Sequence, residues 1–145
     1  MLSQLHIKDF VLIDKLEIEF SDGLNILTGE TGAGKTIIID AINAVLGERV
    51  TSEDIRSGSE RSIISALFEI KGNAVVEEIL ANYGLPLPDE NLLLQREILS
   101  SGKHLCRIND KIVTLGTLIE VGKTLVDIHG QHEHHGEAAP AGWTD

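Results

Sequence analysis

One octapeptide constrains the fold of this chain more than any other feature. Residues 29–36 read Gly-Glu-Thr-Gly-Ala-Gly-Lys-Thr and fit the pattern G-x-x-x-x-G-K-[ST] without a mismatch. The apolar run 24–28 before them predicts a buried strand, and apolar residues at helical spacing after them predict a helix that ends near Gly47. A strand, a glycine-rich loop and a helix in this order are the setting of a phosphate-binding loop. The motif therefore predicts an α/β fold that binds a nucleoside triphosphate.

The chemistry of such a loop follows from its residue types. Glycine has no Cβ, so the backbone can come close to an anion, and the N–H groups of the loop and of the helix start point at the phosphates. Lys35 is placed to neutralise the β and γ oxygens, and the Thr36 hydroxyl is placed to bind Mg²⁺. The alternative is a glycine turn that caps an ordinary helix. The residues that we expect to bind the nucleotide are Gly29, Glu30, Thr31, Gly32, Ala33, Gly34, Lys35 and Thr36.

Composition narrows the class of protein. The 145 residues suffice for one domain with a real core, and 42% hydrophobic with 3% aromatic residues indicates a core of Ile, Leu and Val. The formal charge of −11 argues against direct binding of nucleic acid, which needs clustered Lys and Arg, although simple solubility also explains it. The single cysteine, Cys106, excludes an internal disulfide and lies in an apolar stretch typical of a core. Without a long apolar run or a signal-peptide pattern, we expect a cytoplasmic protein that has no contact with a membrane.

The rest of the chain has the alternation of an antiparallel sheet. Two strands precede the one that enters the motif, and three strands ahead of a phosphate loop favour an ATP-binding-cassette head over small kinases or GTPases. Later hairpins are predicted by turn residues at 100–103 and 109–110. The predicted strands are 2–10, 13–20, 62–70, 92–99, 104–108, 112–113 and 125–128, and the further helices are 74–83 and 114–121.

A second cluster of polar residues, His-Gly-Gln-His-Glu-His-His at 129–135, follows the predicted strand 125–128. Four histidines and a glutamate suggest zinc, but the cluster lacks the H-E-x-x-H spacing that places two ligands on one helical face. A polar loop that leaves a strand is another interpretation. We favour a third, in which the amide oxygen of Gln131, at the end of a strand, binds Mg²⁺ or positions the attacking water.

Several of these segments together resemble a known superfamily. Residues 20–36, which include the motif, and the short segments 40–42 and 46–48 resemble the N-terminal head of SMC-type ATPases. Within that superfamily, the run Leu-Val-Asp-Ile-His-Gly-Gln-His-Glu-His at 125–134 resembles the RecN family of bacterial DNA repair proteins. Residues 56–58 and 106–111 are also placed as in that family. The resemblance covers residues 1–134; its phosphate loop is generic, and its histidine-rich run is specific.

The resemblance implies a P-loop NTPase fold of the ABC/SMC-head type, a mixed sheet with antiparallel N-terminal strands, of which this chain is the N-terminal half. It implies that residues 29–36 bind ATP and Mg²⁺, that Gln131 is the Q-loop residue, and that Arg56 is a basic residue near the nucleotide. In the family, a coiled coil follows, and a C-terminal segment returns with the signature motif, the Walker B acids and a switch histidine. The implied partners are that C-terminal half, a second head in a homodimer, and DNA bound through other regions. The implied role is double-strand-break repair and recombination, at the nucleoid in the full protein.

The chain departs from the family after His134. Residues 135–145 are rich in Ala, Gly and Pro and predict a disordered or foreign tail. No L-S-G-G-x signature and no apolar strand ending in Asp-Glu occurs in the sequence. Phosphoryl transfer depends on positioning and charge stabilisation, and the chain lacks the acidic residue that would orient the attacking water. We therefore expect weak ATP–Mg²⁺ binding without meaningful ATPase activity in this fragment. The alternatives are another SMC-like or cassette ATPase segment, a non-catalytic nucleotide-binding fragment, and a small P-loop kinase, for which lid arginines and an Asp-rich strand are missing.

Overall fold

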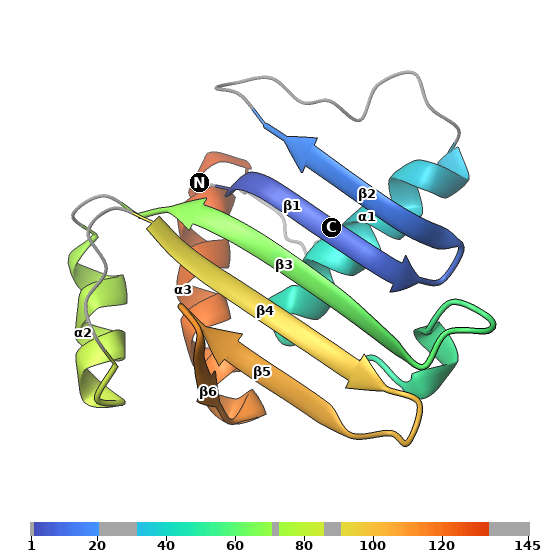
Figure 1. Cartoon of the computed structure of the whole chain (residues 1–145). Coiled ribbons are helices and arrows are strands. Elements are labelled where there is room, and N and C mark those ends of the chain that lie inside the picture. Colours follow the sequence, from blue (N-terminus) through green and yellow to red (C-terminus); the bar gives the residue numbers. More distant parts are fainter. Residues whose placement is uncertain (1, 21–31, 71–72, 86–90, 134–145) are drawn as a thin grey trace.

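The described residues form one six-stranded sheet that carries helices on one of its faces (Figure 1). The computed structural model describes residues 2–20, 32–70, 73–85 and 91–133, and for 32–35 and 126–133 it describes the helical backbone without the side chains. The strand order is β2-β1-β3-β4-β5-β6, and every neighbouring pair is antiparallel. The strands are β1 (Leu2–Phe10), β2 (Ile13–Glu19), β3 (Arg61–Glu69), β4 (Asn91–Leu99), β5 (His104–Ile108) and β6 (Lys111–Val113).

The register of the sheet explains the alternation in the sequence. Side chains that face each other across neighbouring strands point to the same face. One such row crosses five strands and is apolar throughout; it consists of Ile18, Leu5, Ala66, Leu94 and Ile108. The row beside it is polar throughout; it consists of Glu17, His6, Ser65, Gln95 and Arg107. The sheet therefore has one apolar face and one largely polar face.

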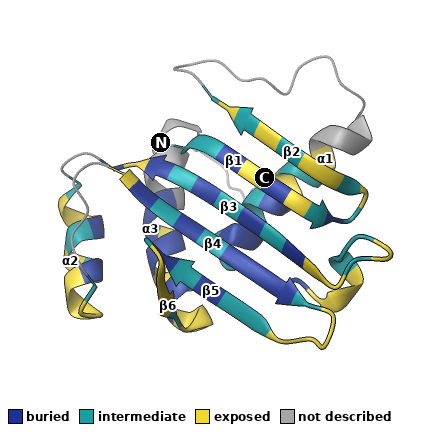
Figure 2. Ribbon diagram, viewed as in Figure 1, coloured by how far each residue is buried: buried dark blue, intermediate teal, exposed yellow. Residues whose placement is uncertain are grey.

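Three helices cover the apolar face: α1 (Gly32–Val45), α2 (Ala74–Asn82) and α3 (Leu115–Glu133). Figure 2 shows the buried residues concentrated where α1 and α3 meet the central strands. The helical residues that are fully buried there include Ala41 and Ala44 of α1 and Leu118 and Val121 of α3. Among the described helices, none is both long enough and apolar enough to cross a membrane.

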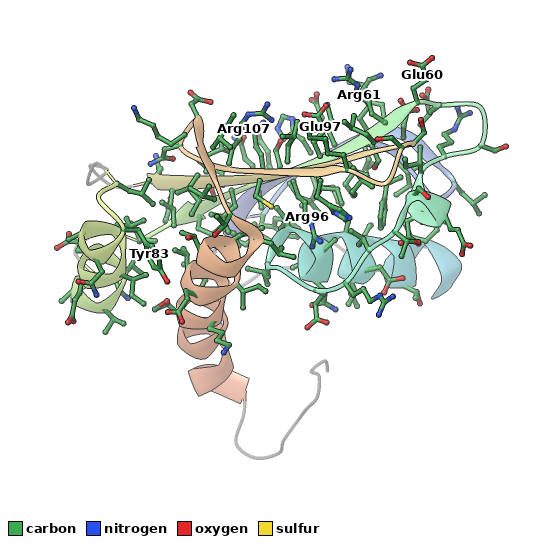
Figure 3. All side chains as sticks on the ribbon, turned by 90° about the horizontal axis from the view of Figure 1, so that it is seen from below. Glu60, Arg61, Tyr83, Arg96, Glu97 and Arg107 are labelled. Carbon is green, nitrogen blue, oxygen red and sulfur yellow. The ribbon has the colours of Figure 1, made fainter. Side chains whose placement is uncertain are left out.

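Charged side chains occupy the opposite face of the sheet (Figure 3). Glu97 on β4 accepts a hydrogen bond from Arg61 on β3 at 2.6 Å and another from Arg107 on β5 at 3.2 Å. Its carboxylate is nearly buried beneath the two guanidinium groups. This triad links three strands on the face that lacks helices.

Both predicted hairpin turns are confirmed. Asn109 and Asp110 join β5 to β6 with φ of +48° and +71°, a left-handed conformation that Asn and Asp tolerate better than most residues. Gly102 supplies a φ of +96° in the turn between β4 and β5. Gly47 also follows α1 in the left-handed region, as predicted for the residue after a helix.

The two C-terminal elements that the sequence predicts are one helix. The predicted helix 114–121 and the predicted strand 125–128 both belong to α3, so the strand assignment is wrong. The physical reason is that Leu118, Val121 and Leu125 are buried on one helical face, and Leu125 is the first residue of the segment read as a strand. The predicted strand 24–28 and the predicted tail 135–145 lie outside the described residues.

Candidate nucleotide-binding site

Helix α1 begins inside the predicted phosphate-binding motif. Its first residue is Gly32, so Lys35 falls in its first turn and the exposed Thr36 follows directly. Gly29, Glu30 and Thr31 lie outside the described residues, as does the side chain of Lys35. The first N–H groups of a helix have no intrahelical acceptor, and the helix dipole places partial positive charge at this end. The start of α1 is thus suited to an anion such as a phosphate group.

A buried arginine holds the opposite end of α1. Arg96, in the interior of β4, is 1% exposed and donates from Nη1 to the carbonyl oxygen of Ala44 at 2.7 Å and to that of Glu48. Figure 3 shows Arg96 on the face of the sheet that carries the helices. The last carbonyl groups of a helix lack intrahelical donors and lie at the negative end of its dipole. The guanidinium group therefore caps α1 with charge-assisted hydrogen bonds.

Two neutral side chains surround this guanidinium group. Burial lowers the pKa of His104, and the charge of Arg96 lowers it further. The Nδ1 atom of His104 lies 3.4 Å from Nη2 of Arg96, where a neutral imidazole can accept a hydrogen bond. Burial raises the pKa of the Cys106 thiol, although Arg96 acts in the opposite direction. Burial also lowers the pKa of Arg96 itself, but a guanidinium group stays charged in a protein.

The same end of α1 packs against α3 through two glycines. A Cβ on Gly47 would lie 2.6 Å from Cγ1 of Ile119. A Cβ on Gly122 would overlap the carbonyl oxygen of Leu46 and lie 3.2 Å from its carbonyl carbon. The turn directly after α1 and helix α3 approach each other this closely only because neither glycine has a side chain. The C-terminal end of α1 is therefore fixed both by Arg96 and by α3.

Gln131 lies near the C-terminal end of α3 and not at the end of a strand. This corrects the predicted setting of the residue, because α3 continues through 125–128. Its side chain lies outside the description, so its role toward Mg²⁺ stays a prediction. The side chains of the histidine-rich run 129–135 lie outside it as well, and the zinc interpretation is untested. Elsewhere in the described part of the chain, no three His, Cys, Asp or Glu residues gather in a way that could hold a metal ion.

Arg56 lies beside the turn that joins β1 to β2. Its backbone N–H donates to the carbonyl oxygen of Asp9 at 2.8 Å, and its Nη1 atom lies 3.9 Å from Oδ1 of the same residue. Burial, and then the charge of Asp54 from the same loop, raise the pKa of Asp40 in α1. The loop that holds Asp54 and Arg56 therefore passes near α1 and reaches the strands. A contact of Arg56 with nucleotide stays a prediction.

The sequence contains signals for Arg96 and Gly122, although neither residue is among the predicted site residues. Alternation along β4 places Arg96 on the same face as Leu92, Leu94 and Ile98, and a charged residue among core positions needs a specific partner. Gly122 interrupts a helical pattern, and an isolated helical glycine often marks a close approach of two backbones. Neither signal identifies the partner, since Arg96 and α1 are far apart in the sequence.

The comparisons with known proteins identify the family of this chain. A family model described as "AAA domain" matches residues 4–115, which is more than half of the chain. The chain belongs to the AAA domain family. It is 45% identical over 134 residues to the DNA repair protein RecN of Bacillus subtilis (strain 168), covering 92% of this chain and 23% of that protein. The chain thus spans about a quarter of the length of this curated relative, and its sequence fits the N-terminal ATPase segment of a RecN protein.

Solved structures give the same fold. A chain from a study of ATP-driven dimerization and DNA-stimulated activation of SMC ATPases superposes with a TM-score of 0.67 at 20% identity, covering 92% of each chain. The SMC head domain from Thermotoga maritima matches with a TM-score of 0.61 at 25% identity, covering 82% of this chain and 41% of that one. The predicted fold, the N-terminal part of an ABC/SMC-type ATPase head, is confirmed.

Proposed function

We propose that residues 1–134 form the nucleotide-binding half of an SMC/RecN-type ATPase head and that 135–145 are a tail outside it. The observation that carries this proposal is that α1 begins within Gly29–Thr36, so the motif stands at the positive end of a helix dipole. In this proposal the loop N–H groups bind the phosphates of ATP. The Lys35 ammonium neutralises the β and γ oxygens.

Magnesium completes the proposed site. The residues that would hold it are Thr36, through its hydroxyl, and Gln131, through its amide oxygen, both of which are oxygen ligands suited to this ion. The ion supplies charge neutralisation at the phosphates when it is bound. Arg56 adds positive charge near the nucleotide in this proposal. Hydrolysis needs a residue that orients the attacking water, and we place that residue in the part of the longer protein that this chain does not contain.

The longer protein gives the proposed role. The curated relative is a DNA repair protein about four times as long as this chain. The activity of such a protein therefore involves segments beyond the one described. We propose that the segment serves double-strand-break repair and recombination in the cytoplasm, at the nucleoid. Binding of ATP between two heads would join them, and DNA would be bound through other regions. The net charge of −11 accords with a segment that does not itself bind DNA.

Binding of a fluorescent ATP analogue (mant-ATP) to the 145-residue chain tests the proposal. We expect Mg²⁺-dependent binding that Lys35→Ala weakens about 10- to 100-fold, the loss of one or two charge-assisted contacts. The matched control is Lys123→Ala, which removes an exposed lysine from α3 and should leave affinity unchanged. Equal affinity of wild type and Lys35→Ala would contradict the proposed site.

A further inference from the structure

The role of Arg96 goes beyond that of a core residue. An apolar side chain would fill the same position without the cost of removing a charge from water. None of the ion pairs among the described residues includes Arg96, so no carboxylate offsets that cost there. What the guanidinium group has instead is the pair of carbonyl oxygens of Ala44 and Glu48. The chief interaction of this buried charge is with the end of α1.

Apolar packing and hydrogen bonding constrain a helix in different ways. Burial of Ala41, Ala44 and Val45 holds α1 against the sheet, but the hydrophobic effect is non-directional and fixes the position of a helix along its axis less sharply than a directional bond does. Hydrogen bonds from Arg96 to two named carbonyl groups are directional, so they fix the helix along that axis and about it. The donor is on β4, an interior strand of the sheet. Arg96 therefore sets the register of α1 against the sheet.

The other end of the same helix carries the motif. Helix α1 has 14 residues, and a helix of this length moves as one rod, so a shift at Ala44 moves Lys35 and Thr36 by a similar distance. Binding of phosphate by a lysine and by helix N–H groups depends on distances that a shift of about 1 Å disrupts. We propose that Arg96 is a positioning residue of the nucleotide site, which holds the start of α1, with Lys35 and Thr36, in place from the far end of the helix. This inference rests on the proposed function.

The role of Arg96 is tested by comparing wild type with Arg96→Met and Arg96→Lys. Lysine keeps the charge but not the rigid planar group that aims Nη1 at both carbonyl oxygens, so both variants should bind mant-ATP about tenfold more weakly than wild type. The control is Val76→Ala in α2, a fully buried position that destabilises the fold away from α1. Affinities are compared at a temperature where urea unfolding shows that every variant is folded. The control should then keep the affinity of wild type.

Hydrogen exchange of the α1 backbone is the second measurement, and it does not depend on nucleotide. Residues 36–45 should exchange faster in Arg96→Met than in Val76→Ala, while the strands exchange alike. If wild type binds mant-ATP no better than Lys35→Ala, the proposed function fails. The hydrogen exchange of Arg96→Met compared with Val76→Ala then decides by itself whether Arg96 fixes α1. Unchanged affinity in both Arg96 variants, or an equal loss in Val76→Ala, would overturn the inference. Arg96→Gln serves if the other two do not fold, and failure of all three to fold would also overturn it, because Arg96 would then support the whole fold.

Discussion

The contact between α1 and α3 makes Gly122 a sharp test of the packing. A Cβ at this position would overlap the carbonyl oxygen of Leu46 and lie 3.2 and 3.3 Å from its carbonyl carbon and Cα, whereas carbon atoms pack best about 3.5–4.0 Å apart. All three are backbone atoms in the turn directly after α1, so they move only if the backbone itself shifts. Overpacking of this kind costs about 1–3 kcal/mol, and the gain in helix propensity from Gly to Ala returns about 1 kcal/mol.

We therefore expect Gly122→Ala to lower the free energy of unfolding by about 1 kcal/mol, or the melting temperature by about 2–4 °C for a chain of this size. Urea unfolding followed by circular dichroism at 222 nm measures this directly, with an unchanged denaturant slope if the denatured state is the same. The matched control is Gly116→Ala in the same helix, whose Cβ would meet only Oγ1 of Thr114 at 3.7 Å. That variant should gain about 0.4–1 kcal/mol. If Gly122→Ala is as stable as wild type, or gains as the control does, the close helix approach described here is refuted.

Three further predictions follow from other contacts. Asn109→Ala should destabilise by about 1–2 kcal/mol in urea unfolding, because it loses the residue that tolerates a φ of +48° and the Oδ1 that accepts from the Leu93 N–H at 2.7 Å; Asp110→Gly, at a φ of +71°, should be neutral or stabilising, and equal losses would contradict the turn. Cys106 should react with a thiol reagent only after unfolding, since it is 3% exposed and burial raises its pKa; fast labelling of the folded chain would count against this. Asp40→Asn should raise the unfolding midpoint slightly at pH 7. The raised pKa of Asp40 means that its ionised form disfavours the fold, a penalty absent below the ordinary value of 3.8 and complete above the raised pKa, so the gain should shrink as the pH falls toward 3.8. A gain that does not change with pH would show another cause.

The sheet was predictable from the sequence because the residue patterns that specify its strands and turns are local. A strand with one buried face alternates residue by residue, and the turns at Gly102 and at Asn109-Asp110 carry the residue types that a left-handed φ requires. Six described strands therefore begin and end within a residue or two of their predicted bounds. The start of α1 at Gly32 agrees with the predicted motif for the same reason, since glycine loop and helix adjoin in the sequence.

The errors and omissions have a common physical cause, which is that they depend on contacts between distant segments. The short apolar run 125–128 fits a buried strand or a buried helix equally well, and only its packing with the rest of α3 decides between them. Because residues 125–128 are helical, Gln131 lies within a helix and not at the end of a strand. Arg96 is equally ambiguous, since alternation places it on the core face but its partners in α1 are fixed only by the folded sheet. The sequence thus predicts the nucleotide site, but it does not predict which backbone groups Arg96 contacts.

The order of the strands also bears on how the chain folds. Strands β1 and β2, β4 and β5, and β5 and β6 are joined by short turns, but β1 pairs on its other side with β3, where Ile7 faces Ile64. The intervening segment holds the motif and all of α1, so this pairing has the largest loop-closure entropy among the described strand pairs, and we expect it to form last. During synthesis the inner edge of β1 waits for β3 for on the order of several seconds. Through that interval β1 is an open strand edge, and a second nascent chain can pair there before α1 is enclosed.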